Sequence, residues 1–143
     1  YVVEGERDQI TYVSPMPGYL GRGGSYVQRL SFRNDGGLLR LEFRHARLNG
    51  WDADEGFDDD EQEPVVLLED VRSARFEYRG IDDQGRIVDW RTSWDRREAL
   101  PALVRLKIEF DRDVRMEWPE LVVPLVVDPS AAFTANEPTF FTR

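Results

Sequence analysis

Three pairs of short segments with alternating apolar and charged residues run through this sequence. In each pair, a segment with one apolar and one arginine-bearing side leads through a polar turn into a second segment. The pairs are residues 30–33 with 39–44, 74–79 with 86–90, and 104–110 with 114–118. A period of two predicts β-strands with one face buried and the other in water. No stretch of ten or more residues has helical periodicity, so the sequence predicts a mainly β fold.

Other elements follow from the same pattern and from the turn residues between the apolar runs. Pro124 cannot donate to a strand ladder, so the apolar segment around it is expected at a sheet edge or a bulge. The expected elements are a strand at 9–13, a loop at 15–24, a hairpin of 25–33 with 38–45, a short buried strand at 65–68, a helical turn at 69–71, a strand at 73–80, a loop at 92–100 and an edge strand at 120–127.

The composition restricts the function. A chain of 143 residues suggests one domain. Its net charge of −9 argues against binding nucleic acid through phosphates and against an anionic membrane surface. With no cysteine, the chain forms neither a disulfide nor a thiolate metal site. It has no apolar run long enough to cross a bilayer, and its first residues read as the interior of a longer protein, with any targeting or anchoring segment upstream.

An acidic loop at 51–64 is the candidate for metal binding. Five of its carboxylates match the ligand positions 1, 3, 7, 9 and 12 of an EF-hand loop, namely Asp52, Asp54, Asp58, Asp60 and Glu63. Phe57, however, stands where the sharp turn needs glycine, and no helices flank the loop. A solvated loop of mutually repelling charges is the simpler interpretation, and a calcium site is the alternative.

No catalytic group is predicted. His45, the only histidine, has no serine or cysteine in a recognisable nucleophile context. The acidic pairs Asp82 with Asp83 and Glu109 with Asp111 could serve a hydrolase as a carboxylate dyad. In a chain with 28 acidic residues such pairs arise by chance, and the first pair is explained by its turn position.

The four tryptophans are candidates for contacts with a partner. A core position is the simpler interpretation for each of them. Trp90 and Trp94 lie four residues apart in a polar segment, so these two are the better candidates for an interface. The alternative function is a carbohydrate-binding β-sandwich module, in which Trp51, Trp90 and Trp94 stack on sugar rings.

The order of segments resembles the minor pseudopilin J family of the type II secretion system. The resemblance covers most of residues 4–112, and it is one of arrangement without an invariant catalytic signature. The matching segments are 5–12, 26–32, 39–46, 65–71 with 75–79, and Trp90 and Trp94 followed by 100–106. The chain departs from the family pattern at Ser14–Gly18 and after Trp118.

This resemblance implies a structural protein without enzymatic activity or a cofactor. The implied fold is two packed antiparallel sheets, with the N-terminal pilin helix missing from this chain. Residues 1–128 would form a periplasmic β domain and 129–143 an irregular tail, joined to the inner membrane only through the missing helix. The implied partners are minor pseudopilins I and K, with which the protein would initiate filament assembly at the pseudopilus tip.

Overall fold

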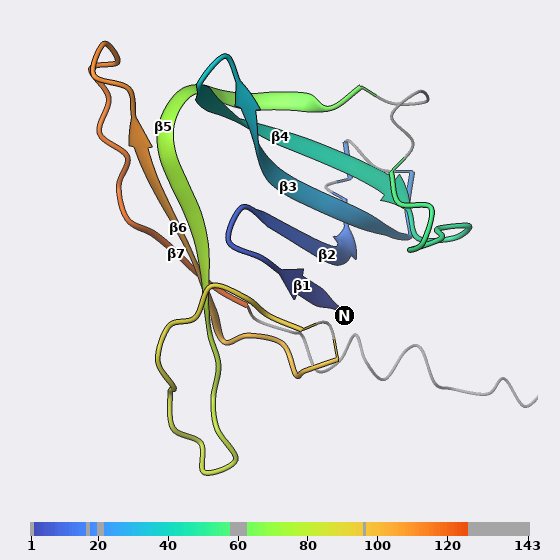
Figure 1. Ribbon diagram of the computed structural model, residues 1–143. Helices are drawn as coiled ribbons and strands as arrows, with labels where there is room; N and C mark the ends of the chain where they lie inside the picture. Colours follow the sequence, from blue (N-terminus) through green and yellow to red (C-terminus); the bar gives the residue numbers. More distant parts are fainter. Residues whose placement is uncertain (1, 17, 20–21, 58–62, 96, 126–143) are drawn as a thin grey trace, which may run out of the picture.

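The protein folds into one antiparallel β-sheet in which each strand pairs with the next one along the chain (Figure 1). The computed structural model describes residues 2–16, 18–19, 22–57, 63–95 and 97–125. The strands are β1 (Val3–Gly5), β2 (Gln9–Pro15), β3 (Ser25–Asp35), β4 (Leu38–Arg47), β5 (Val65–Arg79), β6 (Leu103–Phe110) and β7 (Leu121–Pro124). Within these residues there is no helix, and so no helix that is long and apolar enough to cross a membrane.

The sheet curls sharply at β5, which belongs to both of its halves (Figure 1). The first part of β5 pairs with β4, and the part from Val71 onward pairs with β6. Between them Asp70 has a φ of 56°, and the ladder shifts register between Val71 and Ser73. Such irregularities bend a strand. The expected antiparallel β fold is confirmed, but the two packed sheets are not, because one strand continues from one half into the other.

The turn between β1 and β2 connects the two halves. The Phe32 amide of β3 donates to the Asp8 carbonyl at 2.8 Å, and the Phe76 amide of β5 donates to the Arg7 carbonyl at 2.8 Å. Gly5 and Trp94 exchange a pair of backbone hydrogen bonds of 2.9 and 2.8 Å. These bonds hold the β1–β2 hairpin inside the curl, where it satisfies amide groups from both halves.

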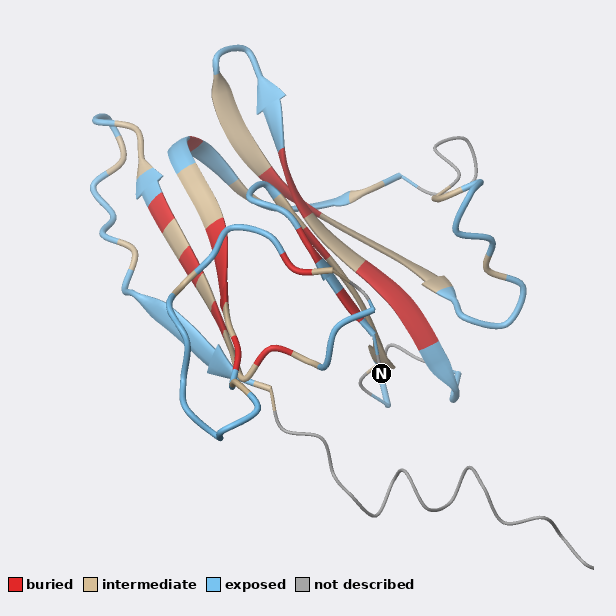
Figure 2. Ribbon diagram, turned by 60° about the horizontal axis from the view of Figure 1, so that its bottom comes forward, coloured by how far each residue is buried: buried red, intermediate tan, exposed pale blue. Residues whose placement is uncertain are grey.

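The core lies inside the curl (Figure 2). Tyr78 is fully buried, and its hydroxyl donates to the Glu6 carbonyl at 2.8 Å and lies 3.1 Å from the Gln9 carbonyl. Gly5 must lack a side chain, because a Cβ there would lie 2.1 Å from the Tyr78 ring. The core consists of Val3, Ile10, Phe32, Leu41, Val71, Phe76, Tyr78, Trp94, Val104, Leu106 and Ile108.

Most of the expected strands are confirmed, and the exceptions are informative. The strands expected at 9–13, 25–33, 38–45, 73–80 and 104–110 all form. The residues expected as a helical turn at 69–71 lie inside β5, and the strand expected to be buried at 65–68 is mostly exposed. Residues 86–90 make only an isolated bridge, and 114–118 form no strand. The edge strand expected around Pro124 is confirmed as β7.

Candidate functional site

An apolar groove opens on the concave side of the curled sheet. Its volume is about 640 Å³, and six of the seven strands contribute side chains to it. The lining includes Val3, Ile10, Tyr12, Leu30, Phe76, Leu100, Val104, Leu106, Leu121, Val123, Pro124 and Leu125. Its floor is formed by core residues such as Ile10 and Phe76, and its exposed apolar rim is formed by Leu121 and Val123, which makes it a candidate for contact with a partner or a ligand.

Strand alternation places these side chains in the groove. Val104 and Leu106 point into the curl, whereas Arg105 between them lies on the outer side with Glu77. On β7, Leu121 and Val123 line the groove, and Val122 between them does not. All three of these β7 residues are exposed, so the wall that β7 forms is not covered by the described part of the chain.

The outer face of β5 and β6 is organised around the Glu77 carboxylate. Arg105 donates to it at 2.6 Å and Arg75 at 3.1 Å, and the Lys107 ammonium lies 3.8 Å away. Burial raises the pKa of Glu77, but the hydrogen bonds from Arg105 and Arg75 outweigh burial, and the pKa lies below its usual value. Glu77 is therefore an ionised structural group, which suits neither a general acid nor a general base near neutral pH.

The structure separates the two tryptophans proposed as partner contacts. Trp94 is only 6% exposed, and its indole nitrogen donates to the Ala99 carbonyl at 3.0 Å. Trp94 is thus a core residue of this domain, and its contact with a partner stays a prediction. Trp90 is half-buried, and the guanidinium groups of Arg79 and Arg105 lie 5.2 and 4.1 Å from its ring.

These contacts also bear on sugar stacking. Trp90 already stacks with arginine, Trp94 is buried, and Trp51 packs against Phe57 at 4.5 Å between ring centroids. The three rings therefore do not form a shared exposed platform.

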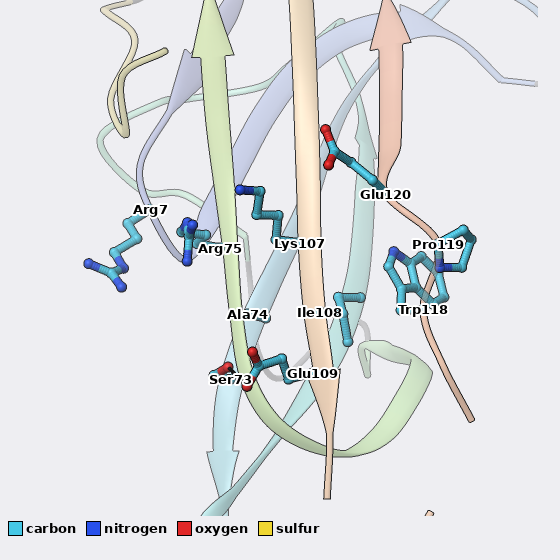
Figure 3. Close-up of a pocket in the computed structure, with 10 residues that line it drawn as sticks. All are labelled: Arg7, Ser73, Ala74, Arg75, Lys107, Ile108, Glu109, Trp118, Pro119 and Glu120. Atoms are coloured by element: carbon cyan, nitrogen blue, oxygen red, sulfur yellow. Dashed lines mark hydrogen bonds between the residues drawn. The ribbon is translucent and has the colours of Figure 1, made fainter. Parts of the chain in front are cut away.

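A pocket of about 380 Å³ lies over β5 and β6 beside Trp118 (Figure 3). Arg75 and Lys107 lie on one side of it, and Trp118 and Pro119 lie on the other. The indole nitrogen of Trp118 is buried, and no described residue accepts its hydrogen bond. The Ser73 hydroxyl donates to Glu109 at 3.2 Å in this pocket, but both residues are exposed and no histidine is among the lining residues.

The acidic loop is described only in part. Asp58 and Asp60, two of the five proposed calcium ligands, lie outside the described residues, and Asp52, Asp54 and Glu63 are exposed. Asp52 uses its carboxylate to accept the Asp54 amide at 2.9 Å, as in a turn. Calcium binding stays a prediction. Calorimetric titration with calcium, against a chelated control, decides it, since no heat at millimolar calcium would end the idea.

His45 and Asp82, considered as catalytic candidates, make contacts that explain them as structural residues. His45 lies between the rings of Tyr26 and Phe43, with centroids at 5.9 and 5.6 Å. Asp82 closes a turn by accepting the amides of Gln84 and Arg86, both at 2.9 Å. The pKa of Asp82 is lowered mainly by the hydrogen bond from the Arg86 amide, and the bond from the Gln84 amide adds to it.

Glu109 of the second acidic pair accepts hydrogen bonds from Arg72 at 3.1 Å and Ser73 at 3.2 Å. The Asp111 amide donates to the Asp70 carbonyl at 2.8 Å. Glu109 and Ser73 both line the pocket beside Trp118. Both are exposed, and Glu109 is also paired with Arg72, so its contacts are those of a surface ion pair.

The described residues thus form a curled all-β domain with a charged outer face and an open apolar groove. Comparison with known proteins gives the family. A family model described as type II secretion system (T2SS), protein J, matches residues 9–117. Type II secretion system protein J of Xanthomonas campestris pv. campestris is 34% identical over 123 residues, which cover 85% of this chain and 56% of that protein.

The chain therefore belongs to the type II secretion system protein J family, and it spans just over half the length of this curated relative. No solved structure matches it. The family resemblance of the sequence is confirmed, and it supports a pseudopilin role.

Sequence reasoning missed the groove and the Glu77 cluster. The groove depends on the curl at β5, and the cluster depends on the register that sets Glu77 opposite Arg105. Only the alternation of Arg105, Lys107 and Glu109 with apolar neighbours indicated that a charged face would form.

Proposed function

We propose that this chain is the β domain of a minor pseudopilin that assembles with minor pseudopilins I and K at the pseudopilus tip. There it initiates filament assembly for protein secretion and carries out no catalysis. In this proposal the domain lies in the periplasm and is anchored to the inner membrane by a pilin helix that precedes it.

The open apolar groove is the observation that carries the proposal. Burying apolar surface contributes roughly 25 cal/mol per Å², so a groove lined by side chains from six strands favours a cover of similar character. We propose that an apolar face of the pilin helix covers it, while the charged outer faces set the choice of neighbouring subunits.

The β7 strand offers a matched pair of substitutions for the test. Val123 lines the groove, whereas Val122, equally exposed, does not. In the full-length gene, Val123→Glu is expected to lower both co-purification with I and K and secretion at least tenfold, because a carboxylate in the covered groove would be buried without a partner. Val122→Glu is expected to leave both co-purification and secretion unchanged.

Equal behaviour of the two variants would contradict the role of the groove. A saturable shift of tryptophan fluorescence on titration with oligosaccharides would instead favour the carbohydrate-binding alternative.

A further inference from the structure

The first part of β5 forms another exposed edge, on the side of β5 where β6 pairs farther along the strand. Residues 65–68 pair with β4 on one side, and the pairing with β6 on the other side begins only at Val71. Figure 1 shows this part of β5 running along β4 with no strand beyond it. Within the described chain, the backbone of residues 65–69 makes no hydrogen bond beyond the sheet ladder. An unpaired row of amide and carbonyl groups is a template for another strand.

The side chains of this edge are apolar on both faces of the sheet. Val65, Val66 and Leu67 are 53%, 41% and 48% exposed, although they are consecutive and so alternate between the faces. Proteins usually protect such an edge with a lysine, a proline or an inward-pointing charge. None of residues 65–68 is of these types, so this edge is left open to pairing.

The ends of the edge carry negative charge. Glu63 precedes it, and Glu69 and Asp70 follow it, all three exposed. Two copies pairing antiparallel along this edge would bring these carboxylates together, which is unfavourable. A partner strand with basic ends would place opposite charges there instead.

We propose that residues 65–69 bind a partner protein by strand addition. The partner contributes an extended segment that is apolar over about four residues and carries lysine or arginine at both ends. Backbone hydrogen bonds to β5 supply much of the affinity, and the exposed apolar side chains and the acidic ends select the segment. This surface is separate from the groove, and the proposal does not depend on assembly with I and K.

The test uses the 143-residue chain and the acetylated, amidated peptide Lys-Val-Leu-Val-Leu-Lys, and binding is followed by NMR of the backbone amides. Binding is expected to shift the amides of residues 65–69 and to slow their hydrogen exchange. Leu67→Lys is expected to weaken binding at least tenfold, and Val65→Lys, a second variant in case the first does not fold, should do the same. Val122→Lys, on the β7 edge, is the control and should bind as the original chain does.

Two control peptides separate the contributions. Replacing both lysines by glutamate should weaken binding, and N-methylation at alternate residues should abolish it, because methylated amides cannot donate. The proposal is overturned if the lysine peptide does not bind, if its shifts fall on β7 or the groove, or if Leu67→Lys and Val65→Lys fold and bind normally. Dimerisation of the chain through residues 65–69 would also overturn it, since the occupant would then be a second copy.

Discussion

Glu77 shows how this chain places a charged residue on a sheet that is only partly in water. Its carboxylate accepts hydrogen bonds from Arg75 and Arg105 and lies close to Lys107. Arg105 also lies against the Trp90 ring, so the ion pair continues into a cation–π contact. Arginine suits this position because a planar guanidinium can donate to a carboxylate and stack on an aromatic ring at the same time.

Glu77→Gln is expected to destabilise the domain at neutral pH and to have little effect in acid. Because the folded-state pKa lies below its usual value, the carboxylate stabilises the fold above the unfolded-state pKa, and this is lost as the pH falls through the folded-state pKa. The expected loss at pH 7 is about 1–3 kcal/mol, typical of hydrogen bonds to a charged group. Urea unfolding at pH 7 and pH 3 measures it, with Glu117→Gln, an exposed change, as the control. An equal loss at both pH values would contradict this account.

Among the elements, β5 determines the shape of the sheet. Asp70 adopts a left-handed conformation where β5 passes from β4 to β6. Aspartate tolerates this conformation better than most residues, whereas a β-branched side chain is a strong outlier there. The bend therefore has a local basis in one residue, and without it the two halves could not enclose a groove.

Asp70→Val is expected to lower the free energy of unfolding by about 1–2 kcal/mol, the cost of a left-handed backbone for an ordinary residue. Asp70→Gly should stay within about 1 kcal/mol of the original chain, because relief of strain offsets the greater freedom of glycine in the unfolded state. Thermal and urea unfolding of both variants measure the difference. If Asp70→Gly lowers the free energy of unfolding as much as Asp70→Val does, the aspartate side chain, and not the backbone conformation, supports the bend.

At the scale of the whole molecule, the two halves of the sheet are tied together through the β1–β2 turn. Tyr78 on β5 donates to the carbonyl of Glu6 in that turn, and its ring packs where only a glycine at position 5 leaves room. Burial, followed by the charges of Glu6 and Asp8, raises the pKa of Tyr78, so the phenol stays protonated and remains a donor.

Tyr78→Phe is expected to lower the free energy of unfolding by about 1–3 kcal/mol, because the carbonyls of Glu6 and Gln9 lose the donor that the buried Tyr78 ring carries. Hydrogen exchange should show faster opening of β1 and β2 relative to β3 and β4. Tyr19→Phe, at a residue that is 86% exposed, is the control and should change nothing measurable. Uniform loss of protection across all strands would show that the turn does not open separately.

Local alternation correctly predicted the strands whose two faces differ most in polarity. β6 is the clearest case, with Val104, Leu106 and Ile108 buried as expected. The prediction for residues 65–68 was wrong because an apolar run does not reveal whether a neighbouring strand covers it. Likewise, Trp94 stands in a polar segment, yet its bridge to Gly5 brings it into the core.

The residue pattern was enough to predict a mainly β chain with one charged and one apolar face in its clearest strands, and its segment order was enough to indicate the family. Both depend on neighbours along the chain. The curl at β5, the groove it encloses, the cations around Glu77 and the open edge at residues 65–69 arise only in the folded molecule. Each of them depends on which strands pair, in what register, and where one strand leaves its neighbour, and these are contacts between residues far apart in the sequence.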